Sequence, residues 1–321
     1  MRISNTELKK FYFKSLYIRK VEEFISLEYS NQEMRTPIHL SLGQEIPAAA
    51  ICSLLSKNDF MISHHRSHAH YLGKDGSLKK LICELYGKSD GCSKGYGGSM
   101  HLIDLKKNFL GATAIVSNSI PVGAGFAYSL KKNRKKNRVC IFVGDAGTEE
   151  GVFYETINFV ALKNLPIIFF CENNKYSVYT HINKRRPKNV SLTNMVNALG
   201  VKSFKLNSAN PIKFYKDLKK IIFNNKENPV FIEVDTYRYC EHTGPRNASI
   251  FDYGSLKDLN FWKKNDPLKK LEKYLINKTF LKLDVKEKYL KDVDYKITNA
   301  VNFAKKSKPP SFKKFLKENK T

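Results

Sequence analysis

Two wholly apolar runs stand out near the middle of the chain, at residues 139–143 and 167–171. Their length and their β-branched and aromatic content predict strands that are buried on both faces of a parallel sheet. Between them, apolar residues recur at helical spacing over residues 151–164. Pro166 ends that helix, because proline disfavours the helical conformation of the residue before it. Strand, helix and strand form a βαβ unit, and residues 230–234 add a further buried strand.

Helical patterns flank this unit. An apolar stripe predicts a helix over residues 6–35, with Thr6 as its cap, and Pro267 in a first turn marks the start of another helix. We therefore predict an α/β fold, a doubly wound parallel sheet with helices on both faces and extra N- and C-terminal helices. The predicted domains are an α/β domain over residues 1–255 and a Lys-rich helical C-terminal tail over residues 256–321.

The net charge of +26 raises the question of nucleic-acid binding. Only 10 of the 56 basic residues are Arg, whereas a phosphate-reading surface favours Arg, and no zinc-finger or aromatic-basic RNA motif is present. A solvated basic surface is favoured, with docking of an acidic partner left open. The six cysteines form no C-x-x-C pair, no apolar leader opens the sequence, and no run approaches the ~20 residues of a membrane span. We expect a cytoplasmic protein that binds neither nucleic acid nor membrane.

Polar side chains follow both strands of the βαβ unit. Asp145 lies just past the first strand and Asn174 just past the second. These strand ends meet at the edge of the sheet where such folds bind ligands. Carboxylate and amide oxygens suit Mg²⁺ or Ca²⁺, and Mg²⁺ usually shares its shell with water and a phosphorylated ligand. The turn glycines Gly144 and Gly147 let backbone N–H groups approach a phosphate. The pattern predicts a metal and phosphate site.

Half of the eight histidines lie within residues 64–70. A zinc site is one interpretation, but the spacing is crowded and this segment contains no Cys or carboxylate partner. The other interpretation is a strand end at which Arg66 binds a diphosphate, since Arg suits multidentate phosphate recognition. His64 and His70 are then expected to be packing or surface residues.

Residues 144–180 resemble the thiamine-diphosphate motif. Within that class they are most similar to the alpha subunit of the decarboxylating component of 2-oxo acid dehydrogenases, the pyruvate and acetoin dehydrogenase group. The residues that carry the likeness are Gly144, Asp145, Gly151, Glu155, Asn158, Leu165, Pro166, Glu172, Asn173, Asn174, Tyr176 and Thr180. The segments 43–45, 97–101 and 237–239 match the same family. The resemblance implies the thiamine-diphosphate-binding fold of the diphosphate-binding type, with thiamine diphosphate and Mg²⁺ as cofactors.

The resemblance also implies roles for single residues. The metal ligands would be Asp145, Asn174 and the backbone carbonyl of Tyr176. The catalytic residues would be His39, His68 and His242, which transfer protons. The cofactor-binding residues would be His65, Arg66, Ala114, Val116, Gly144, Asp145, Ala146, Gly147, Asn174 and Arg238. Ala146 stands where the motif has glycine, and its methyl group is tolerated if its φ is negative.

Members of this family are oxidoreductases that decarboxylate a 2-oxo acid, or cleave acetoin, and pass the acyl unit to an acceptor such as a lipoyl group. They are α₂β₂ heterotetramers with the cofactor held between the subunits. The resemblance therefore implies a beta subunit that completes the active site and a lipoyl-carrying acyltransferase as a further partner.

The loop after Tyr239 departs from the family. Residues 240–244 read Cys-Glu-His-Thr-Gly, whereas the family usually has Gly-His-Ser followed by an acidic residue. Because this loop meets the acceptor, a thiamine-diphosphate-dependent carbon-ligating or sugar-modifying enzyme of surface-glycan biosynthesis is an alternative. A non-catalytic scaffold is a second alternative, weakened by the intact metal and diphosphate residues.

Overall fold

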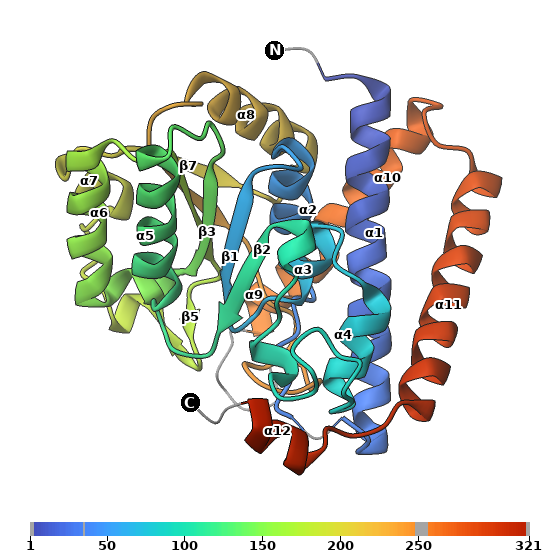
Figure 1. Cartoon of the computed structure of the whole chain (residues 1–321). Helices are drawn as coiled ribbons and strands as arrows, with labels where there is room; N and C mark the ends of the chain where they lie inside the picture. Colours follow the sequence, from blue (N-terminus) through green and yellow to red (C-terminus); the bar gives the residue numbers. More distant parts are fainter. Residues whose placement is uncertain (1–2, 35, 248–255, 319–321) are drawn as a thin grey trace.

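The computed structural model describes residues 3–34, 36–247 and 256–318, and its centre is a six-stranded parallel sheet (Figure 1). The strand order is β2-β1-β3-β4-β8-β7. The bounds are β1 (Phe60–His64), β2 (Phe109–Thr113), β3 (Val139–Gly144), β4 (Ile167–Asn173), β7 (Lys202–Asn207) and β8 (Val230–Asp235). From the neighbouring strands β1 and β3, the following strands are added in opposite directions across the sheet. Ligands bind at such a point in folds of this kind, so we expect the binding edge at the carboxyl ends of β1, β3 and β4.

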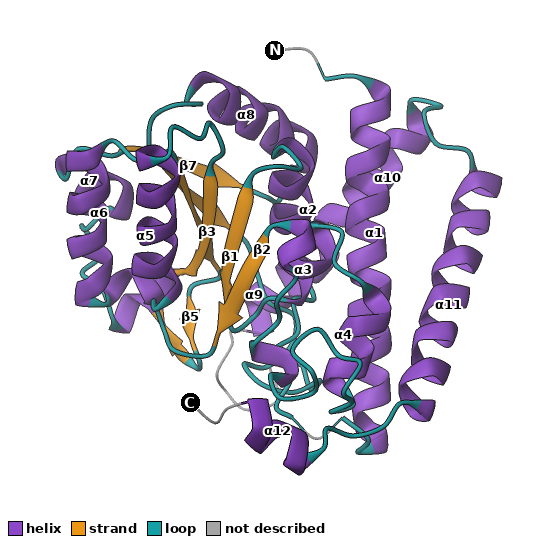
Figure 2. Ribbon diagram, in the orientation of Figure 1, coloured by secondary structure: helices purple, strands orange, loops and turns teal. Residues whose placement is uncertain are grey.

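The central strands are buried on both faces, as their apolar runs predict. In β3, Cys140 and Phe142 belong to one hydrophobic cluster, whereas Ile141 and Val143 belong to another on the opposite face. This division follows from the two-residue period of a strand. Helices cover both faces (Figure 2), which confirms the predicted doubly wound α/β fold.

One face of the sheet is covered by three helices, α5 (Ser119–Lys132), α6 (Gly151–Lys163) and α7 (Leu192–Ala198). The other face carries the larger helical layer. Its members are α1 (Asn5–Glu28), α2 (Glu45–Leu54), α3 (His68–Gly73), α4 (Leu78–Leu85), α8 (Pro211–Asn224), α9 (Leu256–Lys264), α10 (Pro267–Asn277) and α11 (Leu283–Lys306), while α12 (Phe312–Glu318) follows at the end. None of the helices in the described residues combines the length and the apolar character required to cross a bilayer.

The N- and C-terminal helices are joined by a buried ion network. Arg19 of α1 donates to both carboxylate oxygens of Glu45 in α2, at 2.5 and 3.0 Å, and to Asp266 at the start of α10, at 2.9 Å. Leu271, Leu275 and Val293 then join the same hydrophobic cluster as α1. The helices beyond residue 256 thus share a core with the α/β part, and the division of the chain at that point remains a prediction.

Three local expectations differ from the structure. The cap of α1 is Ser4, not Thr6, because Ser4 and Glu7 exchange hydrogen bonds in a capping box, at 3.2 and 2.8 Å. Helix α1 ends at Glu28, seven residues before the predicted end at residue 35. The edge strands β2 and β7 were not predicted. β7 mixes exposed and half-buried residues, and β2 is half-buried after Phe109, so neither has the fully buried apolar run of a central strand.

Candidate functional site

A cavity of about 300 Å³ opens where the carboxyl ends of β1, β3, β4 and β8 meet. It brings together all but one of the residues singled out from the sequence. The predicted residues that line it are His39, His65, Arg66, Ala114, Val116, Gly144, Asp145, Ala146, Gly147, Asn174, Tyr176, Arg238 and His242. They come from segments separated by up to 203 positions, and the parallel sheet places them at one edge.

The acidic side of the cavity is formed by η4 (Asp145–Glu149), a 3₁₀ helix that follows β3 directly. Asp145 is almost completely buried, and burial raises the pKa of its carboxyl, although the Arg185 guanidinium opposes this shift. Arg185 donates to Asp145 at 2.5 Å and to Glu149 at 2.6 Å. Ala146 has no positive φ, so the methyl group that replaces the motif glycine introduces no backbone strain.

Asn174 follows β4 and faces the same cavity. Its amide nitrogen donates to Gln44 at 3.2 Å, and its oxygen accepts the backbone N–H of Tyr176 at 3.0 Å. Tyr176 begins the short hairpin of β5 (Tyr176–Ser177) and β6 (Thr180–His181). Asp145 and Asn174 therefore lie at neighbouring strand ends and line one cavity, as their spacing predicts.

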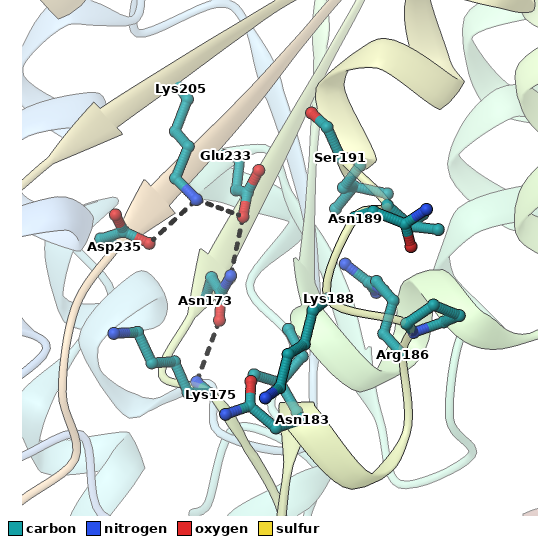
Figure 3. A pocket seen from close by; sticks show the side chains of 14 residues that line it. Asn173, Lys175, Asn183, Arg186, Lys188, Asn189, Ser191, Lys205, Glu233 and Asp235 are labelled. Atoms are coloured by element: carbon teal, nitrogen blue, oxygen red, sulfur yellow. Dashed lines mark hydrogen bonds and ion pairs between the residues drawn. The ribbon is translucent and has the colours of Figure 1, made fainter.

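A second hollow, of about 360 Å³, lies beside this one at the ends of β4, β7 and β8 (Figure 3). A chain of contacts crosses it. Asn173 donates to Glu233 at 2.7 Å and accepts from the backbone of Lys175 at 3.0 Å, while Lys205 pairs with Glu233 and Asp235. These contacts hold the end of β4 to β8 and thereby fix the position of Asn174.

Two buried arginines form the basic side of the cavity. Arg66 donates to the carbonyls of Leu40 at 2.6 Å and His242 at 3.1 Å, and Arg238 donates to the carbonyl of Val178 at 2.9 Å. Among the described residues, neither guanidinium forms an ion pair with a carboxylate. Burial, followed by the charge of Arg238, lowers the pKa of Arg66 to about 9, and burial lowers the pKa of Arg238 as well. The cavity thus holds two cations that no carboxylate in the described part of the chain pairs with directly.

Three histidine rings gather beside these arginines. His39 lies 4.8 Å from His65 and 5.0 Å from His242, measured between ring centroids. Burial and the charge of Arg66 lower the pKa of His39 to about 2 and that of His242 to about 3, with Arg238 adding to the latter; burial lowers the pKa of His65 too. All three rings are therefore neutral near pH 7.

His68 is the predicted residue that does not line the cavity. Its ring is completely buried, with Nδ1 2.7 Å from Glu22 and Nε2 2.8 Å from Ser99. The Ser99 hydroxyl also accepts the backbone N–H of His39, at 3.2 Å. Because His68 begins α3, its side chain points into the helical layer, where this network supports the segment that carries His39. This position does not support the predicted role of His68 in proton transfer.

Several residues at the cavity were not assigned a role from the sequence. Gln44 and Glu172 line the cavity and belong to motifs without an assigned role, whereas Arg185 lies outside the lining and contacts the site through its bond to Asp145. His64 was expected to be a packing or surface residue, and its ring does line the cavity. Their contacts join segments far apart in the chain, so local spacing could not indicate them.

Comparison with known proteins agrees with this geometry. Residues 14–313 match the family described as "Dehydrogenase E1 component". The chain is 33% identical over 313 residues to the pyruvate dehydrogenase E1 component subunit alpha of Rickettsia bellii (strain RML369-C), covering 95% of this chain and 94% of the relative. It is 30% identical to the chloroplastic subunit alpha-3 of the same component from Arabidopsis thaliana, covering 98% of this chain and 74% of the relative. The chain belongs to the dehydrogenase E1 component family, on the pyruvate dehydrogenase alpha-subunit side.

Proposed function

We propose that this protein is the alpha subunit of a cytoplasmic, thiamine-diphosphate-dependent 2-oxo acid dehydrogenase of the pyruvate or acetoin type. It holds the diphosphate and Mg²⁺ half of the active site, and a beta subunit completes that site in an α₂β₂ heterotetramer. The acyl unit passes to an acceptor such as the lipoyl group of an acyltransferase. The observation that carries the proposal is the meeting of two uncompensated arginines with Asp145 and Asn174 at one cavity.

The donor set fits Mg²⁺. Asp145 and Asn174 supply hard oxygen ligands from adjacent strand ends, and the backbone carbonyl of Tyr176 is the proposed third protein ligand. A cation beside Asp145 is already favourable in this structure, since Arg185 occupies that position. Two or three protein ligands leave room for water and phosphate oxygens, which is how Mg²⁺ is usually held.

The opposite wall fits a diphosphate. Bringing an anion between Arg66 and Arg238 would relieve the repulsion and desolvation that lower the pKa of Arg66. Gly144 has open space where a side chain would project, so the backbone can approach a phosphate closely. His65, Ala114, Ala146 and Gly147 add the remaining proposed contacts to the cofactor.

When bound, thiamine diphosphate would supply a positively charged ring that accepts the electron pair released as carbon dioxide leaves the 2-oxo acid. The protein's own contribution is orientation and proton handling. Neutral His39 has its Nε2 3.1 Å from the hydroxyl of Thr243, whereas its buried Nδ1 has no hydrogen-bond partner among the described residues. The His39 ring lines the cavity beside His242, where it would hold or accept a proton at the reacting oxygen.

A partner at the cavity mouth is supported by the exposed apolar residues there. Ile115 is 67% exposed, Val116 51% and Val178 43%, and the last two line the cavity. Apolar side chains at the rim of a binding site are typical of surfaces that a second subunit covers.

The six free cysteines, five of them buried, support a reducing compartment and hence the cytoplasm.

The first test is calorimetric titration of thiamine diphosphate with Mg²⁺ into the chain co-expressed with its beta subunit. We expect saturable binding to the wild type and at least about tenfold weaker binding to Asp145→Ala, because the variant lacks the only carboxylate among the proposed ligands. Asp90→Ala, which removes an exposed aspartate, is the matched control and should bind like the wild type. Absence of binding to the intact complex would refute the cofactor assignment and restore the scaffold alternative.

Removing the cation that competes for Asp145 should have the opposite effect. In Arg185→Gln, the affinity for Mg²⁺ in the presence of thiamine diphosphate should rise about tenfold. In the wild type, Mg²⁺ must displace the charge-assisted hydrogen bond from Arg185 to Asp145, and the variant lacks this bond. Titration of Mg²⁺ measures this directly. Lys184→Gln removes the same charge from the neighbouring exposed position and should leave the affinity unchanged. Equal affinities of Arg185→Gln and wild type would show that Arg185 does not compete with the metal.

A further inference from the structure

Three side chains converge at the carboxyl ends of β1 and β4, beside the cavity. They are His64, His70 and Glu172, whose side chains are 12%, 1% and 3% exposed. Their ligand atoms all lie within 4.8 Å of one another. Nε2 of His70 is 3.2 Å from Oε2 of Glu172, and Nε2 of His64 is 3.6 Å from the same oxygen.

Both ring nitrogens face Oε2 of Glu172 at ion-pair distance. Nε2 of His64, Nε2 of His70 and Oε1 of Glu172 are buried and have no hydrogen-bond partner among the described residues. A buried polar atom without a partner is unfavourable, so three of them close together require an explanation. A cation bound by the Nε2 atoms of both histidines and by the Glu172 carboxylate would give these buried polar groups a partner.

The separations fit a metal ion. Zinc bonds of about 2.0–2.1 Å to imidazole nitrogen and about 2.0–2.2 Å to carboxylate oxygen place tetrahedral ligand atoms roughly 3.3–3.5 Å apart. The two observed separations of 3.2 and 3.6 Å lie close to this value. Two imidazoles and one carboxylate are also a common donor set for divalent zinc and iron, with positions left open for water or substrate.

The surroundings orient His70 in particular. Its Nδ1 lies 2.7 Å from the Ser63 hydroxyl, and its ring stacks on Phe142 at 3.7 Å. Such an outer contact fixes the tautomer and ring orientation of a metal-binding histidine. His64 is less committed, because its Nδ1 accepts the backbone N–H of Arg66 at 3.2 Å, and binding a metal through Nε2 would move its ring proton and give up that contact.

We propose that His64, His70 and Glu172 form a binding site for a divalent transition-metal ion of the zinc type, distinct from the oxygen ligands at Asp145 and Asn174. The other group of three histidines does not offer the same site. His39 is engaged by Thr243 and His242 by Arg238, and that group contains no carboxylate. His64 and Glu172 also line the cavity. This site does not depend on the proposed function.

The test uses Co²⁺ as a spectroscopic probe on the full chain after treatment with a chelator. We expect one Co²⁺ ion to bind per chain and to give visible d–d absorption. Addition of Zn²⁺ should displace the Co²⁺ and remove this absorption. His70→Ala and Glu172→Gln should each weaken binding by about 100-fold or more, whereas His64→Ala should weaken it less, since His64 gives up a contact on binding. Circular dichroism confirms that each variant is folded. Glu172→Gln keeps the shape of the side chain and carries the test if His70→Ala does not fold.

Three further variants locate the ion. Asp145→Ala, His242→Ala and His181→Ala should all retain the Co²⁺ spectrum, because they remove the proposed Mg²⁺ ligand, a member of the other histidine group and a distant histidine. Failure of the wild type to bind Co²⁺ would overturn the proposal. So would binding that survives both His70→Ala and Glu172→Gln, or binding that is lost only in His242→Ala.

Discussion

Replacing Arg66 with methionine should weaken binding of thiamine diphosphate with Mg²⁺ by about 100-fold, while the unliganded chain stays as stable as the wild type or becomes more stable. A buried charge-assisted pair with an anion contributes about 1.5–3 kcal/mol, which corresponds to a factor of roughly 10 to 150 in affinity. Without the anion, the charge of Arg66 is unfavourable, as its lowered pKa shows. In the folded chain this cation opposes folding at neutral pH.

The two effects are measured separately. Calorimetric titration of the complex with the beta subunit gives the affinity, and thermal unfolding of the chain without cofactor gives the stability. Arg134→Met is the matched control, because Arg134 is exposed and precedes β3 at the opposite end of the sheet. A variant with normal affinity would contradict the assignment of Arg66 to the diphosphate. Strong destabilisation of the unliganded chain would show that its hydrogen bonds to Leu40 and His242 outweigh its unfavourable charge.

Replacing Gly43 with alanine should lower the free energy of unfolding by about 3–5 kcal/mol. Gly43 has a φ of +93°, a conformation that L side chains rarely adopt. A Cβ atom there would clash with the carbonyl oxygen of Tyr237 and lie 2.8 Å from the ring of Tyr239. Neither group can move freely, because the backbone N–H of Tyr239 donates to Leu42 at 2.8 Å and its ring is buried. The strained backbone conformation and the steric overlap of the Cβ atom therefore both lower the stability of the variant.

Urea unfolding of the chain measures this loss. Gly125→Ala is the control, since Gly125 lies inside helix α5 with open space around the position of a Cβ atom. That change should raise stability by about 0.4–1 kcal/mol, because alanine restricts the unfolded chain and favours a helix. A loss below 1 kcal/mol in Gly43→Ala would mean that the segment after β8 can shift. In that case Gln44, which contacts Asn174, would be expected to move as well.

The sequence by itself determined the central part of this protein. The apolar runs at residues 139–143 and 167–171 predicted strands buried on two faces, and such strands imply parallel pairing with helices on both sides. The positions of Asp145 and Asn174 after those strands then followed, because strand ends in a parallel sheet meet at one edge. The family motifs added the histidines and arginines, and the cavity contains all of them except His68.

Only the tertiary structure decided which of these residues touch and what charge they carry. Local spacing indicated no carboxylate near His64 and His70, yet Glu172 reaches both from β4, about a hundred positions away. The tertiary structure also pairs Arg185 with Asp145 and places the His68 ring beside Glu22. The edge strands β2 and β7 gave no continuous apolar signal because neither is fully buried along its length. Periodicity reports which face of an element is buried, whereas contacts between distant segments and the pKa shifts that they cause depend on the packing of the whole chain.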